Sequence, residues 1–267
     1  KYLVVHVKIM FMKFFSKRKS YSYDQIVNLK KKQIGNKIHR IFKGRVASGL
    51  YKNMKISLKE NWGNDIGSKI LGMYEEQIQK TIYKIAKEKK INTLINFGAA
   101  EGYHLIGPVK KKIIPYGYGI EIDIETKKTL KKNIILNKLS EKIKIINFED
   151  FKSLKMKIKN QNSSKILILI DIEGNEYDLL NENNMKYFKN DFLIIELHQF
   201  MCSSLNKHKK FIKLLKKFYK IEEIRNSRRN PYLKEIEHLP DDERWMIVSE
   251  GRPSEMIWFI CYPKTKR

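Results

Sequence analysis

The chain has 267 residues and a formal net charge of +26, from 55 Lys and Arg against 29 Asp and Glu. A chain of this length can bury one full hydrophobic core. Only nine of its basic residues are Arg, and the excess of Lys, Ile and Asn suggests a coding bias toward A/T-rich codons, which argues against a dedicated nucleic-acid surface. Cys202 and Cys261 are the only cysteines, so a disulfide scaffold is excluded and we expect a reducing, cytoplasmic compartment.

The first 60 residues are predicted to form a basic, helical extension to a main domain at 61–267. Their apolar segment at 3–15 contains His6, Lys8 and Lys13, is shorter than the roughly 20 apolar residues that span a bilayer, and lacks a cleavage site. We therefore expect neither a transmembrane segment nor a secretory signal, while peripheral contact with a membrane stays open.

The rest of the chain alternates strand and helix patterns. Apolar residues recur at three- and four-residue steps between 67 and 90, which predicts a helix leading into the first core strand. Strands are then predicted at 92–97, 115–121, 142–147, 165–170 and 191–198, and helices at 102–112, 125–137, 151–159, 175–188 and 205–218. Such apolar strands predict a mostly parallel sheet with helices on both faces. Strands at 218–225 and 256–262 complete it, and 226–255 is predicted as an insertion passing over the sheet's edge.

The sequence NFGAAEG (96–102) follows the first predicted strand and opens a helix. Small residues at 98, 100 and 102 would let the backbone pass close to a ligand. The fingerprint of dinucleotide-binding domains would need glycine where Ala100 and Tyr103 stand, and Glu101 would repel a pyrophosphate. A nucleoside with a cationic end therefore suits this turn better than a dinucleotide.

Acidic residues also end the second and third predicted strands. Glu121 lies 19 residues after Gly102, where a carboxylate can accept hydrogen bonds from two ribose hydroxyls, although a solvated carboxylate is the simpler alternative and Asp123 could substitute for it. Glu149 and Asp150 end the third strand, where either could meet an adenine edge. Asp150 could equally cap the following helix.

Four polar side chains end the fourth and fifth predicted strands: Asp171, Glu173, Glu196 and His198. Glu196 and His198 face the same side of their strand, so we expect the four groups to converge at the carboxyl edge of the sheet. Together they could tune a general base near neutral pH, or hold a divalent metal through oxygen and nitrogen, although no metal is assigned. Taken singly, each acid could be a helix cap and His198 a hydrogen-bonded core histidine.

The segments GAAEGYHLIG, IEID, DIEGNEYDLL and IIELH resemble the S-adenosylmethionine-dependent methyltransferases of the FkbM type, in which a DxEGxE segment follows the fourth strand. The flanking segments LGMYEEQI (71–78) and EGRPSEMIWF (250–259) are also similar, so the resemblance covers about residues 45–263. It implies a Rossmann-like class I methyltransferase fold of about seven mostly parallel strands with an antiparallel last strand. One departure is Asn96, where an Asp often stands.

The resemblance implies S-adenosylmethionine as the cofactor. The residues predicted to bind it are Asn96, Gly98, Ala100, Glu101, Gly102, Tyr103, Glu121, Ile122, Glu149, Asp150 and Asp171. Glu121 would hold the ribose, and Asp171 would border both the cofactor and the acceptor. The residues that would line the methionine end are Asn96, Gly98, Ala100 and Gly102, and Glu149 or Asp150 would lie near the adenine.

The hypothesis that follows is O-methylation of a sugar, a glycan or another small polar hydroxyl acceptor. We expect His198 to act as the base, with Asp171, Glu173 and Glu196 orienting the acceptor or a metal. Arg252 could clamp an anionic group of the acceptor, or simply pair with Glu250.

Two alternatives remain. A nucleic-acid methyltransferase is favoured only by the net charge, because the Pro-Pro turn of the amino-methylating enzymes is absent after the fourth strand and an acidic acceptor site would repel phosphates. A non-catalytic nucleoside-binding module is the other alternative. Nothing in the sequence assigns an oligomeric state.

Overall fold

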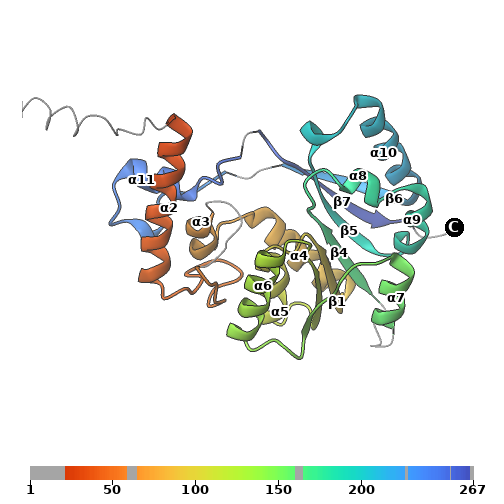
Figure 1. The fold of residues 1–267 in the computed structure, drawn as a ribbon, viewed down its shortest axis with the longest axis horizontal. Helices are drawn as coiled ribbons and strands as arrows, with labels where there is room; N and C mark the ends of the chain where they lie inside the picture. The colour runs from red at the N-terminus through yellow and green to blue at the C-terminus, as the bar shows by residue number, and fades with distance from the viewer. Residues whose placement is uncertain (1–21, 59–64, 160–164, 226–227, 253, 265–267) are drawn as a thin grey trace, which may run out of the picture.

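The computed structural model describes residues 22–58, 65–159, 165–225, 228–252 and 254–264, so the apolar segment at 3–15 lies outside the described residues. A single seven-stranded sheet forms the centre, in the order β3-β2-β1-β4-β5-β7-β6 (Figure 1). Its strands are β1 (Thr93–Phe97), β2 (Tyr116–Ile120), β3 (Ile143–Ile145), β4 (Ile166–Ile170), β5 (Phe192–Leu197), β6 (Tyr219–Arg225) and β7 (Ile257–Pro263). The first five strands pair in parallel, whereas β7 runs antiparallel to both β5 and β6. The predicted fold class is confirmed.

Helices cover both faces of the sheet. The central strands are apolar on both faces and must be shielded from water, as in β4, whose five residues are all apolar and buried. One face packs against α4 (Glu76–Lys89), α5 (Tyr103–Lys110) and α6 (Ile124–Leu136). The other packs against α7 (Phe151–Lys159), α8 (Glu176–Leu179), α9 (Glu182–Phe188) and α10 (Leu205–Phe218). Two hydrophobic clusters, one on each side of the sheet, therefore form the core.

Two of the predicted helices are interrupted. The predicted helix at 67–90 is divided into α3 (Ile66–Leu71) and α4, because Gly72 is left-handed at φ 79° and a Cβ there would lie 2.1 Å from the carbonyl oxygen of Ser48. The predicted helix at 175–188 is divided into α8 and α9, where Asn181 accepts a hydrogen bond from the Asn184 backbone N–H at 3.0 Å and starts a new helix.

The described part of the N-terminal region contains one long helix and a turn-rich segment after it. α2 (Tyr23–Ile41) begins with a capping box, in which Ser22 and Gln25 bond each other's backbone N–H groups. The division at residue 60 stays a prediction, and apolar residues from both sides of it, such as Ile38 and Ile70, join one cluster. No described helix is both long enough and apolar enough to cross a membrane.

The segment 226–255 differs from the prediction of an excursion over the edge of the sheet. It carries a short 3-10 turn (η2, Lys234–Ile236) and α11 (Asp241–Val248), and α11 packs against α2 and α3 instead (Figure 1). The three helices meet at two glycines, which leave room for close packing. A Cβ on Gly67 of α3 would lie 2.0 Å from Cδ1 of Ile247 on α11, and 3.6 Å from the Cα of Gly35 on α2.

We predict that Gly67→Ala destabilises the protein by about 1–3 kcal/mol, because the added methyl overpacks this three-helix junction. Urea denaturation measures the effect. In an Ile247→Ala background, which removes the opposing atoms, the same substitution should cost much less. Equal costs in the two backgrounds would show that α11 does not pack on α3 in this way.

Candidate active site

The turn after β1 passes directly over the end of β4. Gly98 is left-handed at φ 73°, and its N–H donates to the Ile120 carbonyl at 3.0 Å. A Cβ on Gly98 would lie 1.7 Å from the backbone oxygen of Asp171, so only glycine allows this approach. The turn, β2 and the residue that follows β4 are therefore held together at one edge of the sheet.

Glu121 stands at the tip of β2, next to the turn, as predicted. Its carboxylate accepts hydrogen bonds from the backbone N–H groups of Ala100 and Asp123, both at 2.9 Å. Asp123 caps α6 by accepting from the Thr126 N–H at 2.7 Å, so it does not substitute for Glu121. Gly102 allows close packing, because a Cβ there would meet side chains of α5 and α6.

Glu101 and Tyr103 point into the protein rather than out of the turn. Glu101 is buried in an ion pair with Lys69 of α3, with 2.6 Å between Nζ and Oε1. The Tyr103 hydroxyl lies 3.3 Å from the Lys69 carbonyl oxygen. The expectation that Glu101 presents a free charge that repels a pyrophosphate is therefore wrong, because Lys69 neutralises this charge.

Asn96 has an unused hydrogen-bond acceptor. The residue is 3% exposed at the end of β1, and its Oδ1 atom has no hydrogen-bond partner among the described residues. A buried amide oxygen without a donor is costly, so a ligand donor at this position would be stabilised.

Other residues predicted to bind the cofactor are more exposed. Ile122 is 88% exposed. Glu149 and Asp150 border a cavity of about 380 Å³, together with Phe148 and residues of α7, α8 and α9. Asp150 also accepts hydrogen bonds from the N–H and hydroxyl of Ser153, which confirms the helix-cap alternative without excluding a ligand.

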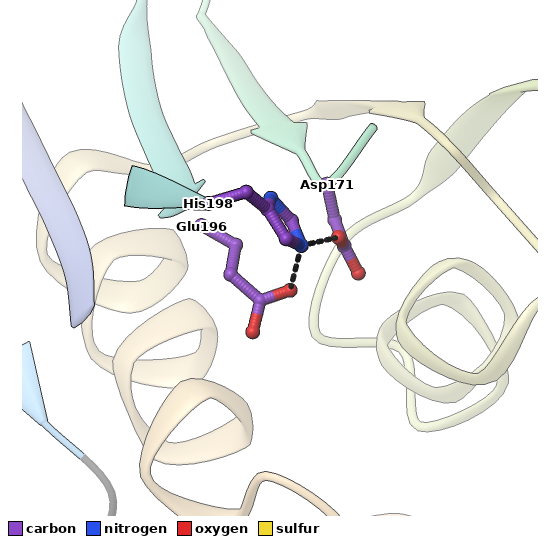
Figure 2. A group of neighbouring side chains, drawn as sticks. All are labelled: Asp171, Glu196 and His198. Atoms are coloured by element: carbon purple, nitrogen blue, oxygen red, sulfur yellow. Dashed lines mark ion pairs between the residues drawn. The ribbon is translucent and has the colours of Figure 1, made fainter. Parts of the chain in front are cut away.

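The four polar groups of β4 and β5 converge as predicted, and we call Asp171, Glu173, Glu196 and His198 the acid–imidazole cluster. Nε2 of His198 lies 3.3 Å from Glu173 Oε2, 3.6 Å from Glu196 Oε2 and 3.7 Å from Asp171 Oδ1. Figure 2 shows Asp171, Glu196 and His198 pointing toward one another. The parallel register, in which Ile170 pairs with Ile195, brings the two strand ends to the same level.

One member of this site was not predicted. Glu176, the last acid of the DIEGNE segment, is fully buried on α8. It accepts the backbone N–H of His198 at 2.8 Å, and its Oε1 atom lies 3.5 Å from His198 Nδ1. The sequence contained a signal for this residue, because Glu176 lies three positions after Glu173 in the same acidic segment. Its predicted position at the start of a helix, however, suggested no role in the site.

The acid–imidazole cluster places three carboxyl groups around one imidazole. Burial raises the pKa of Glu196 well above its ordinary value, and the charge of Asp171 adds to this effect. Burial likewise raises the pKa of Glu173, although His198 partly opposes the shift. For His198, burial alone would lower the pKa, but the carboxylates of Glu176, Asp171 and Glu173 outweigh it and raise the pKa. A cation at this position would be stabilised.

Arg252 does not present a free charge to an acceptor. Its guanidinium group pairs with Glu196, with Glu75 and, at 2.8 Å from Nε, with Glu250. The alternative of pairing with Glu250 is therefore confirmed, and the predicted substrate clamp is occupied by protein carboxylates. Glu75, which was not predicted, is fully buried and also contacts His104 Nε2 at 2.6 Å.

We predict that Arg252→Met destabilises the protein by about 3–5 kcal/mol, because it leaves buried carboxylates without a cation. Urea unfolding checks this. Arg225→Met is the matched control, since Arg225 also pairs with two carboxylates, Glu223 and Glu255, but does so on the exposed surface, where little change is expected. Similar losses in both variants would contradict the role assigned to Arg252.

No family model matches the chain, and no curated protein matches it, so the FkbM resemblance stays a prediction. Many solved structures resemble the fold. One is an O-methyltransferase from Bacillus cereus in complex with SAH, which is 9% identical, with a TM-score of 0.47 over 93% of this chain and 96% of that one. Another is the precorrin-6y C5,15-methyltransferase from Geobacter metallireducens, 8% identical, with a TM-score of 0.45 over 71% of this chain and 89% of that one.

A third is the tRNA methyltransferase TrmK of B. subtilis, 11% identical, with a TM-score of 0.44 over 68% of this chain and 64% of that one. All three TM-scores are below 0.5, so these are distant likenesses of fold. The chemistry of the chain has to be inferred from its own site residues.

Proposed function

We propose that the chain is an S-adenosylmethionine-dependent methyltransferase that methylates a hydroxyl of a sugar, a glycan or another small polar acceptor. The observation that carries the proposal is the edge formed by the Gly98 turn, the Glu121 carboxylate and the unused Oδ1 of Asn96. This edge offers hydrogen-bond acceptors for an ammonium group, at Asn96, and for hydroxyl groups, at Glu121. It lies next to the acid–imidazole cluster, whose carboxylates favour a positively charged ligand.

The residues at this edge suit the cofactor in three places. Asn96 would accept a hydrogen bond from its ammonium group, Glu121 would accept from its ribose, and Glu149 and Asp150 border the cavity on the adenine side. The cofactor supplies a methyl group on a positively charged sulfonium centre. The carboxylates of the acid–imidazole cluster would attract this charge, whereas they would repel the pyrophosphate of a dinucleotide.

Accessibility favours Glu173 over His198 as the general base. The His198 side chain is 2% exposed, whereas that of Glu173 is 49% exposed, so an acceptor oxygen can reach Glu173 more easily. Glu173 is left-handed at φ 51° and precedes Gly174 at φ 91°, a strained turn of the kind that often marks functional sites. Its raised pKa also makes the carboxylate a stronger base. We therefore assign the base to Glu173 and give His198 the role of orienting it.

A second candidate acceptor is nucleic acid. The observation that favours it is a cavity of about 680 Å³ along α10, which four lysines border together with Tyr177 and Phe211. These lysines are Lys207, Lys210, Lys213 and Lys217. This basic cavity would attract phosphates, although the acid–imidazole cluster itself would repel them.

Titration of the purified protein with S-adenosylmethionine by calorimetry tests the proposed cofactor. We predict one saturable site, and affinity roughly ten- to hundredfold weaker in Glu121→Gln, because a hydrogen bond to a charged acceptor contributes about 1.5–3 kcal/mol. Glu182→Gln, on the exposed side of α9, is the control and should bind like the wild type. If the protein does not bind S-adenosylmethionine, the proposed cofactor is wrong. The chain would then be a non-catalytic module or would bind another ligand.

Methyl-labelled cofactor, offered with glycans, small hydroxyl compounds and RNA, identifies the acceptor. With the acceptor that takes the label, we predict that Glu173→Gln lowers kcat roughly 100-fold or more, without weakening cofactor binding, because a positioned base contributes about that factor. Glu141→Gln, at an exposed position that borders neither cavity, serves as the control. If Glu173→Gln retains full turnover, Glu173 is not the base.

A further inference from the structure

Three side chains at the ends of β4 and β5 have the arrangement of metal ligands. One atom from each of Asp171, Glu196 and His198 lies within 4.8 Å of the other two. The two oxygens lie 3.7 Å and 3.6 Å from His198 Nε2. A metal bound at roughly 2.1 Å from each ligand separates neighbouring ligands by roughly 3.0–3.5 Å, so small side-chain movements would close the site.

His198 is held as a metal ligand would be. The residue is 2% exposed, its Nδ1 has no hydrogen-bond partner among the described residues, and Nε2 points into the cluster, toward the Asp171 and Glu196 carboxylates (Figure 2). Behind the ring, the buried Glu176 fixes the backbone of His198 and lies 3.5 Å from Nδ1. Metal-bound histidines commonly place a carboxylate behind the second ring nitrogen in this way, which orients the ring.

The two carboxylates each keep an oxygen free for a cation. Arg252 pairs with Oε1 of Glu196, so Oε2 faces His198. Asp171 Oδ1 is buried without a hydrogen-bond partner among the described residues. A buried carboxylate oxygen that has no donor and lies close to a second carboxylate is unfavourable unless a positive charge lies between them.

We propose that Asp171, Glu196 and His198 bind one divalent metal cation at the carboxyl edge of the sheet. Two carboxylate oxygens and one imidazole nitrogen suit a cation of intermediate hardness such as Mn²⁺, with Mg²⁺ as a weaker competitor. Arg252 holds one ligand and Glu176 orients another, so both are positioning residues. The existence of the site does not depend on methyl transfer.

The role of the cation does rest on the proposed function. Glu173 lies 3.3 Å from His198 Nε2 and is partly open to solvent, so an acceptor hydroxyl that reaches Glu173 would also lie beside the cation. A neighbouring divalent cation makes a hydroxyl more acidic, which would help the Glu173 carboxylate to remove the proton. The carboxylate would take up that proton, and the acceptor oxygen would use the freed electron pair to bond to the methyl carbon. The carbon–sulfur bond of the sulfonium would break at the same time, and its electron pair would stay on sulfur as a neutral thioether leaves.

Titration of chelator-treated full-length protein with Mn²⁺, followed by electron paramagnetic resonance, tests the proposal. We expect one saturable site, displaced by excess Mg²⁺, with a nitrogen coupling in pulsed spectra from His198. Asp171→Asn and His198→Asn should each weaken Mn²⁺ binding at least tenfold, and His198→Asn should also remove the nitrogen coupling. Glu176→Gln should weaken binding roughly tenfold through the orientation of the ring. Glu182→Gln should bind Mn²⁺ like the wild type.

Thermal melts in chelator show whether each variant folds, and only the wild type and the control should gain thermal stability on adding Mn²⁺. The metal site would be overturned if Mn²⁺ binding is not saturable, or if Asp171→Asn and His198→Asn bind Mn²⁺ like the wild type. In that case protonated His198 would be the positive charge that compensates the carboxylates. Calorimetry with S-adenosylmethionine in chelator separates the two proposals, because cofactor binding without metal would support the proposed function even if the metal site fails.

Discussion

The close approach of the turn after β1 to the end of β4 is the constraint on which the candidate site depends. Gly98 leaves no room for a side chain against the Asp171 backbone, so the two strand ends stay in contact. From this contact, Ala100 reaches the Glu121 carboxylate on one side, and Asp171 reaches the acid–imidazole cluster on the other. The proposed nucleoside site and the proposed proton-transfer site thus share one edge, which is where ligands bind in open parallel sheets.

Buried charge is the second organising feature. Carboxylates from a loop before α4, from β5 and from the segment before β7 all meet the guanidinium of Arg252. Removing charges from water is costly unless each has a partner, so these pairs tie distant parts of the chain to the sheet edge. The same network leaves the acid–imidazole cluster with more negative than positive charge, which favours a cationic ligand. Both the sulfonium of the cofactor and a divalent metal have the sign that the site requires.

The N-terminal helix and the 226–255 segment contribute to the site indirectly. α11 packs on α2 and α3, and α3 carries Lys69, which neutralises Glu101 inside the glycine turn. The segment then returns toward the sheet through Glu250 and Arg252, which hold Glu75 and Glu196. These parts of the chain therefore stabilise the edge of the sheet at which the chemistry is proposed.

From the sequence alone, the order of strands and helices, the fold class, the glycine turn and the four groups of the acid–imidazole cluster could be predicted. Each depends on periodicity or on the ends of individual strands, which are local properties. Only the tertiary structure decided what Glu101, Glu176 and Arg252 contact. Arg252 and Glu75, for example, are 177 positions apart, and no local pattern specifies a pair that forms only after the sheet and its flanking helices have packed. Accessibility was decided in the same way: the sequence favoured His198 as the base, but packing buries His198 and leaves Glu173 open.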